Sequence, residues 1–155
     1  MSEDEIRASF ESFEAVEGRL QFVREIGGIK IYNDNNATTP EATLAALSAL
    51  DGGRKNIVLI AGGSDKGLDV SPLICEIRKT CKTVLLLSGT GTERIRNEIP
   101  GAQVFDGLKP AVEAALAAST AGDTILFSPA FASFGMFTNE YERNDQFLAA
   151  VSERT

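Results

Sequence analysis

Polar side chains that suit the binding of anions and hydroxyl groups gather in four short segments of this chain. These segments are residues 33–38 (NDNNAT), 62–67 (GGSDKG), 88–92 (SGTGT) and 128–133 (SPAFAS). Lys66 can meet an anion, Asp34 can accept a hydrogen bond from a ribose hydroxyl, and Thr38 can donate to a phosphate or carboxylate. Because Asn, Asp, Ser and Gly are also the usual residues of tight turns, a purely structural role stays open for each segment.

The last of these segments connects an apolar run to a long amphipathic one. Pro129 stops a strand there, because proline has no backbone donor for a sheet. Ser133 stands directly before aromatic residues at helical spacing, which predicts a helix from about residue 134 to 153 with Ser133 as its N-cap. Free N–H groups at such a helix start, together with Ser133 Oγ, would suit a carboxylate or phosphate. A plain structural cap is the alternative, and turn chemistry alone favours it.

The two glycine-rich segments do not complete a known nucleotide fingerprint. The loop G-x-x-x-x-G-K-[ST] occurs nowhere in the chain. Residues 88–92 resemble half of a dinucleotide fingerprint, yet the third glycine and the acidic residue after the next strand are missing. The structural alternatives are a solvated glycine turn at residues 62–67 and a turn capped by Thr90 or Thr92.

Composition excludes several classes of function. A length of 155 residues fits about one domain, and a net charge of −7 argues against a nucleic acid or an anionic membrane as the main partner. The chain has no histidine, which removes Ser-His-Asp and Cys-His catalysis and the commonest zinc ligand. Cys75 and Cys81 do not have the spacing of a metal clip, and two unmatched thiols are typical of a reducing, cytoplasmic protein. The apolar runs are too short to span a membrane.

Hydrophobic periodicity predicts the elements that must hold these polar segments. A hairpin signal around Gly27 and Gly28 comes first, and buried apolar runs then alternate with helical patterns. The expected strands are residues 19–25, 29–33, 56–63, 83–89, 103–105 and 124–127, and the expected helices are residues 2–13, 40–50, 70–81, 92–99, 108–120 and 134–153. Strands without alternation, separated by helices, indicate a parallel sheet covered on both faces.

The expected fold is therefore α/β, with an open, mostly parallel, Rossmann-like sheet, helices on both faces and an antiparallel N-terminal hairpin strand. In such a sheet, ligands bind outside the carboxyl ends of the strands. Each polar segment follows an expected strand, so we expect the segments to meet at one rim of the sheet.

The motifs in their order resemble the C-terminal domain of the Mur ligases. The stretches that carry the resemblance are GRLQFV, YNDNNATTPEATLAAL, LIAGGSDKGLDVSPL and LFSPAFASFGMFTNEYERNDQF. SPAFAS, followed by an aromatic-rich segment with Glu142 and Arg143, is similar to the members that add D-glutamate. The resemblance runs from about residue 16 to 155, which leaves residues 1–15 as a linker helix or a remnant of an upstream region.

The resemblance implies a ligase that uses ATP and Mg²⁺. In this family the carboxylate of UDP-N-acetylmuramoyl-L-alanine becomes an acyl phosphate, which the amine of D-glutamate attacks. The family's motifs assign the D-glutamate carboxylates to Thr38, Lys66, Ser133 and the backbone of Phe134. They assign the nucleotide to Arg19 and Asp34, with Asn36 beside them, and they place no metal ligand in this chain.

Two residues depart from the family's pattern. Asn36 stands where many relatives have lysine, and Glu140 stands where relatives often have an aromatic residue beside the amino acid. The family's P-loop and magnesium ligands lie in a central domain, and its UDP-sugar site lies in a first domain. We therefore expect neither ATP nor Mg²⁺ to bind this chain alone, and we expect the missing domains to be its partners. The alternative is a free-standing, non-catalytic α/β binding or scaffold module.

Overall fold

A six-stranded sheet forms the centre of the protein, in a computed structural model that describes residues 2–5 and 16–154. The strand order across the sheet is β1-β2-β6-β3-β4-β5. The strands are β1 (Gln21–Ile26), β2 (Ile29–Asn33), β3 (Ile57–Ala61), β4 (Cys81–Leu87), β5 (Gln103–Phe105) and β6 (Thr124–Phe127). Most of the helix expected over residues 2–13, and with it the proposed linker, lies outside the described residues.

The strand directions confirm the predicted fold class. Strand β1 pairs antiparallel with β2, whereas the pairs β2·β6, β6·β3, β3·β4 and β4·β5 are parallel. The helices are α2 (Pro40–Leu50), α3 (Ser71–Thr80), α4 (Thr90–Ile95), the short 3-10 helix η1 (Arg96–Glu98), α5 (Leu108–Ala118) and α6 (Glu140–Ser152). Parallel neighbours require crossover connections, and the helices supply them.

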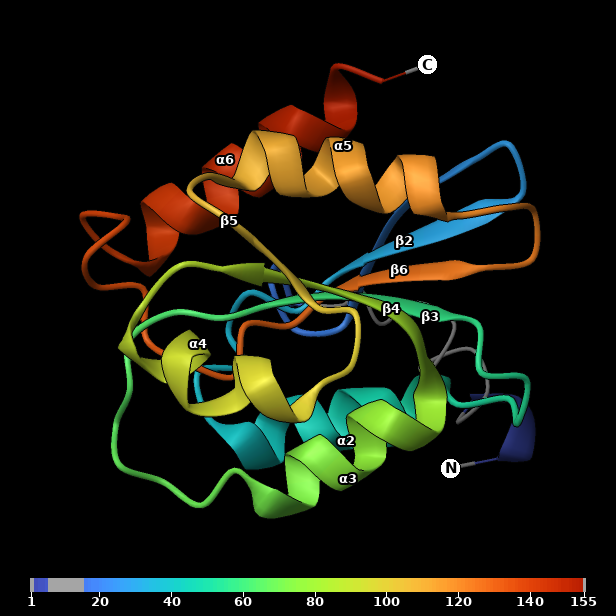
Figure 1. The fold of residues 1–155 in the computed structure, drawn as a ribbon. Helices are drawn as coiled ribbons and strands as arrows, with labels where there is room; N and C mark the ends of the chain where they lie inside the picture. Colours follow the sequence, from blue (N-terminus) through green and yellow to red (C-terminus); the bar gives the residue numbers. More distant parts are fainter. Residues whose placement is uncertain (1, 6–15, 155) are drawn as a thin grey trace.

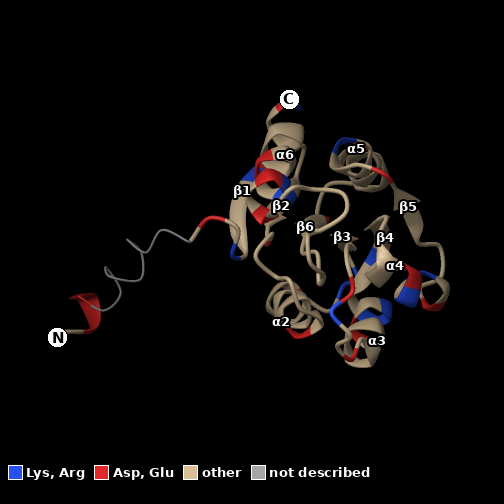
Figure 2. Ribbon diagram, turned by 90° about the vertical axis from the view of Figure 1, so that its left-hand side faces the viewer, with Lys and Arg blue, Asp and Glu red and all other residues tan. Residues whose placement is uncertain are grey.

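The sheet separates two hydrophobic cores. Helices α5 and α6 cover one face, and α2, α3 and α4 cover the other (Figure 1). Figure 2 looks along the strands, so that they are seen end-on between the same layers, and shows charged residues on the outer helices. Successive strand residues point to opposite faces, so Leu59 joins the core under α2 and α3 while Ile60 joins the core under α5 and α6. Phe127 of β6 and Phe147 of α6 stack with ring centroids 4.5 Å apart in the second core.

Two local predictions near the amino terminus are confirmed. Gly27 and Gly28, with φ of 56° and 81°, make the turn between β1 and β2, where a left-handed backbone favours glycine. Thr39 caps α2 by accepting a hydrogen bond from the backbone N of Ala42 at 3.3 Å, and Pro40 follows in the first turn.

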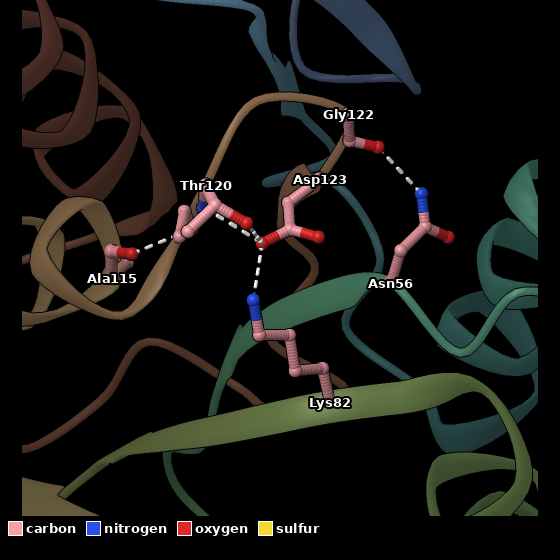
Figure 3. Close-up of polar contacts among 7 residues, drawn as sticks. Asn56, Lys82, Ala115, Thr120, Gly122 and Asp123 are labelled. Atoms are coloured by element: carbon pink, nitrogen blue, oxygen red, sulfur yellow. Dashed lines mark hydrogen bonds and ion pairs between the residues drawn. The ribbon is translucent and has the colours of Figure 1, made fainter.

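A polar cluster holds the start of β6 at the end of the sheet opposite the rim expected to bind ligands. Lys82 Nζ of β4 donates to Asp123 Oδ2 at 2.5 Å, and the backbone N of Thr120 donates to the same oxygen at 2.8 Å (Figure 3). Asn56 Nδ2 donates to the backbone O of Gly122 at 2.7 Å. These contacts fix the turn that leads into the central strand β6.

The prediction for the terminal helix was wrong at its start. Helix α6 begins at Glu140 rather than at residue 134, and its N-cap is Asn139, whose Oδ1 accepts from Glu142 N at 2.9 Å. Ser133 caps no helix; its backbone O accepts from Phe137 N at 3.2 Å in a turn. Gly135, with φ of 94°, adopts a left-handed conformation that interrupts helical geometry between Ser133 and Asn139.

Candidate functional site

Backbone hydrogen bonds bring the four polar segments together at one rim of the sheet. Ser64 N donates to Ala132 O at 2.9 Å, and Ala132 N donates to Ser64 O at 3.1 Å. Ala130 N donates to Ala37 O at 2.9 Å while Ala130 holds a left-handed φ of 66°. Such a conformation costs about 1 kcal/mol for alanine and persists where its surroundings impose it. The segment 128–133 is thus clamped between its two neighbours.

Glycines allow the close approach of these segments. A Cβ at Gly63 would overlap the backbone O of Ala132, and a Cβ at Gly89 would overlap Gly63. A Cβ at Gly91 would overlap the buried ring of Phe131. The glycines that resembled half of a dinucleotide fingerprint are therefore needed for packing within the rim.

The structural alternative for residues 88–92, a turn capped by Thr90 or Thr92, was also wrong. The N-cap of α4 is Gly89, which has no side-chain cap. Thr92 Oγ1 donates instead to the backbone O of Leu87, and Thr90 Oγ1 accepts from the backbone N of Asp65 at 2.9 Å. Thr92 is thus bound to the end of strand β4, and Thr90 is bound to segment 62–67.

Two adjoining hollows at the rim contain every site residue predicted from the sequence. The α2 hollow, of about 260 Å³, is lined by Arg19, Leu20, Asp34, Asn36, Ala37 and three alanines of α2. The α6 hollow, of about 410 Å³, is lined by Arg19, Asn36, Thr38, Lys66, Ala132, Ser133, Phe134, Glu140 and Tyr141. The predicted nucleotide residues thus line the first hollow and the predicted D-glutamate residues line the second, with Arg19 and Asn36 between them.

Asp34 is the buried carboxylate of the α2 hollow. Its Oδ1 accepts from Leu20 N at 2.9 Å and its Oδ2 accepts from Ser128 Oγ at 2.7 Å. Burial raises the pKa of Asp34, although both hydrogen bonds and the nearby charge of Arg19 act to lower it. A carboxylate held in this way can accept a further hydrogen bond from a ligand hydroxyl group.

The α6 hollow places a cation beside hydroxyl groups. Lys66 Nζ donates to Thr38 Oγ1 at 3.1 Å, and Ser133, which is buried, lines the same hollow. Phe134 and Tyr141 also line it, with 69% and 72% of their surfaces exposed. An ammonium group and hydroxyl donors in one hollow suit a carboxylate or phosphate, and large exposed aromatic residues indicate a surface that meets another molecule.

Asn36 is held by contacts with residues 17 and 18, which precede strand β1. Its Nδ2 donates to the backbone O of Glu17 at 3.3 Å. A Cβ at Gly18 would come within 2.8 Å of Asn36 Oδ1, so the two residues pack closely. Asn36 therefore supplies no charge to either hollow, and Lys66 and Arg19 are the cations that line the α6 hollow.

A buried pair, Arg143 and Asn35, supports the site and had no predicted role. Arg143 donates from Nε to Asn35 Oδ1 at 2.8 Å, from Nη2 to Asn35 O at 2.9 Å and from Nη1 to Phe131 O at 3.1 Å. The guanidinium is fully buried, and burial lowers the pKa of Arg143 to about 10. Arg143 belongs to a recognised motif, but its burial could not be read from sequence, because arginine is usually exposed.

Residues 2–5 and 16–154 contain neither a candidate metal centre nor a membrane-spanning helix. Within these ranges no three His, Cys, Asp or Glu side chains gather to hold a metal ion. Of the helices described, none has the length and apolar character needed to cross a bilayer. Cys75 is exposed and Cys81 is buried, and both are free thiols.

Comparison with known proteins identifies the domain that carries these hollows. The family described as Mur ligase, glutamate ligase domain, matches residues 18–131. This chain belongs to the Mur ligase family, as its C-terminal domain. The resemblance seen in the four motifs is thereby confirmed.

Ligase sequences from several bacteria match this Mur ligase domain along nearly its whole length. A UDP-N-acetylmuramoylalanine–D-glutamate ligase of Roseiflexus sp. is 42% identical over 98% of this chain and 34% of the relative. The enzyme of the same name from Caldanaerobacter subterraneus is 37% identical over 97% of this chain and 34% of the relative. The chain therefore spans about a third of the length of these relatives.

Solved structures share the fold at low sequence identity. The MurF ligase of Thermotoga maritima in complex with ADP has a TM-score of 0.65 at 19% identity, over 93% of this chain and 33% of that one. A bifunctional folylpolyglutamate synthase/dihydrofolate synthase of Yersinia pestis has a TM-score of 0.68 at 16% identity, over 98% of this chain and 35% of that one. These likenesses establish the fold of the Mur ligase domain and leave its substrate to other observations.

Proposed function

We propose that this chain is the amino-acid-binding lid domain of an ATP-dependent ligase that adds D-glutamate to UDP-N-acetylmuramoyl-L-alanine. The observation that carries the proposal is the α6 hollow, which gathers Lys66, Thr38, Ser133 and Phe134 around one space. The names of the matching relatives support the same reaction. The role would belong to peptidoglycan precursor synthesis, and hence to cell wall biogenesis, cell shape and cell division, in the cytoplasm.

The α6 hollow would hold the two carboxylates of D-glutamate. Lys66 would bind one carboxylate by charge, with Thr38 Oγ1 already within hydrogen-bond distance of its ammonium group. Ser133 Oγ and the backbone N of Phe134 would donate to a carboxylate. Since Ser133 caps no helix, its role in this site rests on its hydroxyl group and on the turn that follows it.

The α2 hollow would hold part of the nucleotide. Asp34 would accept a hydrogen bond from a ribose hydroxyl, and Arg19 would approach a phosphate with Asn36 alongside. Residues 16–155 would act as one domain in this role, joined to the rest of the enzyme by residues 1–15.

The chemistry would need groups that are not found in this sequence. ATP, with Mg²⁺, would activate the alanine carboxylate as an acyl phosphate, and no P-loop sequence occurs here to bind the transferred phosphate. A central domain would therefore supply the P-loop and the metal ligands. The residues of this chain would hold D-glutamate with its amine directed toward the activated carboxylate, so their contribution would be orientation.

The alternative function, a free-standing non-catalytic module, is not favoured. Its motivation was the replacement of lysine by Asn36 and the missing domains. Both hollows keep charged and hydrogen-bonding side chains, and the relatives that match nearly the whole chain are ligases by name.

A chimeric ligase tests the proposal. Residues 16–155 would be joined to the first two domains of the Roseiflexus relative, and phosphate release that depends on D-glutamate would be measured. We expect turnover, and we expect Ser133→Ala to raise the KM for D-glutamate roughly tenfold, the effect of losing one hydrogen bond to a charged group. Ser48→Ala, on the exposed surface of α2, is the matched control. Turnover with an unchanged KM in Ser133→Ala would remove Ser133 from the site.

A further inference from the structure

We infer that Glu140 recognises the amine of the incoming amino acid and so determines the specificity of the α6 hollow. The inference rests on the proposed function and assigns the one substrate group that the other lining residues leave without a partner. Glu140 lines this hollow as the first residue of α6. Its carboxylate makes this hollow chemically different from a simple anion site.

The charges that line the α6 hollow match those of an acidic amino acid. Lys66 and Arg19 are cations, the hydroxyl groups of Thr38 and Ser133 are donors, and Glu140 is the one carboxylate among the described residues that line the hollow. D-Glutamate brings two carboxylates and one ammonium group. A carboxylate in the hollow repels both carboxylates of the ligand, unless the ligand turns its ammonium group toward it.

The position of Glu140 is fixed by the buried contacts described above. Glu140 is the first residue of α6, and its backbone O accepts from Asn35 Nδ2 at 3.0 Å. Asn35 is in turn bound by Arg143 from further along the same helix. The backbone of Glu140 is thereby tied to segment 33–38 at the edge of the hollow.

The side chain of Glu140 is free to meet a ligand. Across residues 2–5 and 16–154 its carboxylate has no hydrogen bond and no ion pair, and the charge that acts on it is that of the buried Arg143 guanidinium. Glu142, the other acid in the first turn of α6, is occupied: it accepts from Thr138 N at 2.6 Å and from Gln146 Nε2 at 3.0 Å. A structural reason for Glu140, the favourable charge of an acid at a helix N-terminus, applies equally to Glu142. Glu142 is therefore a matched control.

Two ligands that differ only in the amine separate these roles. Glutarate is glutamate without its amino group and keeps both carboxylates. Each ligand would be titrated into the ¹⁵N-labelled full chain, and dissociation constants would be taken from the amide shifts of residues 38, 66 and 132–134. The measured quantity is the ratio of the glutarate constant to the D-glutamate constant in the unmodified chain, in Glu140→Gln and in Glu142→Gln.

We expect the unmodified chain and Glu142→Gln to bind D-glutamate roughly tenfold more tightly than glutarate. In Glu140→Gln the ratio should fall to about one. The ammonium group of D-glutamate then has no carboxylate to pair with, and the carboxylates of glutarate are no longer repelled by Glu140. The inference would be overturned by a ratio of about one in the unmodified chain, or by a tenfold ratio that persists in Glu140→Gln. Either result would leave the proposed function standing. If neither ligand shifts these amides in the unmodified chain, the proposed function fails instead.

Discussion

Arg143 and Asn35 form the central contact between the terminal helix and the candidate site. Arg143 Nε lies 2.8 Å from Asn35 Oδ1, and Arg143 Nη2 lies 2.9 Å from the backbone O of Asn35. Segment 33–38 supplies Asp34, Asn36 and Thr38 to the two hollows. The buried guanidinium of Arg143 does not line either hollow. It positions the site residues of segment 33–38 through its hydrogen bonds to Asn35.

Removal of this contact should destabilise the domain. Arg143→Ala leaves three buried oxygen atoms, Asn35 O, Asn35 Oδ1 and Phe131 O, without their hydrogen-bond donor. We therefore expect the free energy of unfolding to fall by about 3 kcal/mol. Arg143→Lys should recover little of it, because an ammonium group cannot reproduce the planar fork of donors. Urea denaturation of the three proteins measures both effects.

An exposed arginine provides the comparison. Arg96 pairs with Glu93 at 3.0 Å with both side chains largely exposed, and Arg96→Ala should change the free energy of unfolding by less than about 1 kcal/mol. If Arg143→Ala and Arg96→Ala were equally mild, the supporting role of Arg143 would be refuted.

Elements with regular periodicity were predictable, and the start of α6 shows where such prediction stops. Apolar runs without alternation indicated buried parallel strands, and Thr39 with Pro40 located the start of α2. Ser133 before an aromatic run gave an equally clear N-cap signal, yet Gly135 adopts φ of 94° and delays the helix to Glu140. A glycine's backbone conformation depends on tertiary packing, which local spacing does not contain.

Gly91 should be intolerant of a side chain, although it lies in α4. Alanine is favoured over glycine in a helix by about 1 kcal/mol. A Cβ at this position would overlap the ring of Phe131, which is buried in the core and belongs to segment 128–133. We expect Gly91→Ala to lower the free energy of unfolding by about 1–3 kcal/mol, measured by urea denaturation.

The control for this substitution is Gly52. A Cβ there would meet nothing within 4 Å, so Gly52→Ala tests the loss of glycine without a clash. We expect it to leave stability within about 0.5 kcal/mol of the original. Equal stabilities for Gly91→Ala and Gly52→Ala would contradict the close packing of the rim.

Two buried aspartates should titrate on opposite sides of the ordinary value of about 3.9. Burial raises the pKa of Asp34 above it, whereas at Asp123 burial is outweighed by hydrogen bonds from Lys82 and Thr120, which lower the pKa. Carboxyl ¹³C titrations measure both directly. In Lys82→Ala the pKa of Asp123 should move upward. The substitution removes the hydrogen bond and the positive charge that counteract the effect of burial.

The same shifts give opposite dependences of stability on pH. Asp123 contributes stability that is present above about pH 3.9 and is lost as pH falls through its lowered folded-state pKa. Asp34 acts in reverse: its contribution is largest below about pH 3.9 and declines as pH rises through its raised folded-state pKa. An Asp34 pKa below that of Asp123 would contradict this account.

The grouping of the polar site residues was predictable from the sequence, but the buried contacts that hold them in place were not. Strand ends in a parallel sheet share one rim, so Asp34, Thr38, Lys66 and Ser133 could be expected to lie close together. The role of Arg143 depends on complete burial without a carboxylate among its hydrogen-bond partners, which is rare for arginine. Likewise, the packing of Gly91 against Phe131 joins segments distant in sequence, and no local pattern indicates it.

The most direct measurement of the central claim is the KM for D-glutamate of the chimeric ligase with Lys66→Ala. Lys66 is the cation that lies in the α6 hollow beside Thr38, and its loss should raise this KM at least tenfold, the lower end for a hydrogen bond to a charged group. Lys109→Ala, which removes an exposed lysine paired with Glu153, should leave it unchanged. An unchanged KM and turnover in Lys66→Ala would contradict the assignment of this hollow to the amino acid.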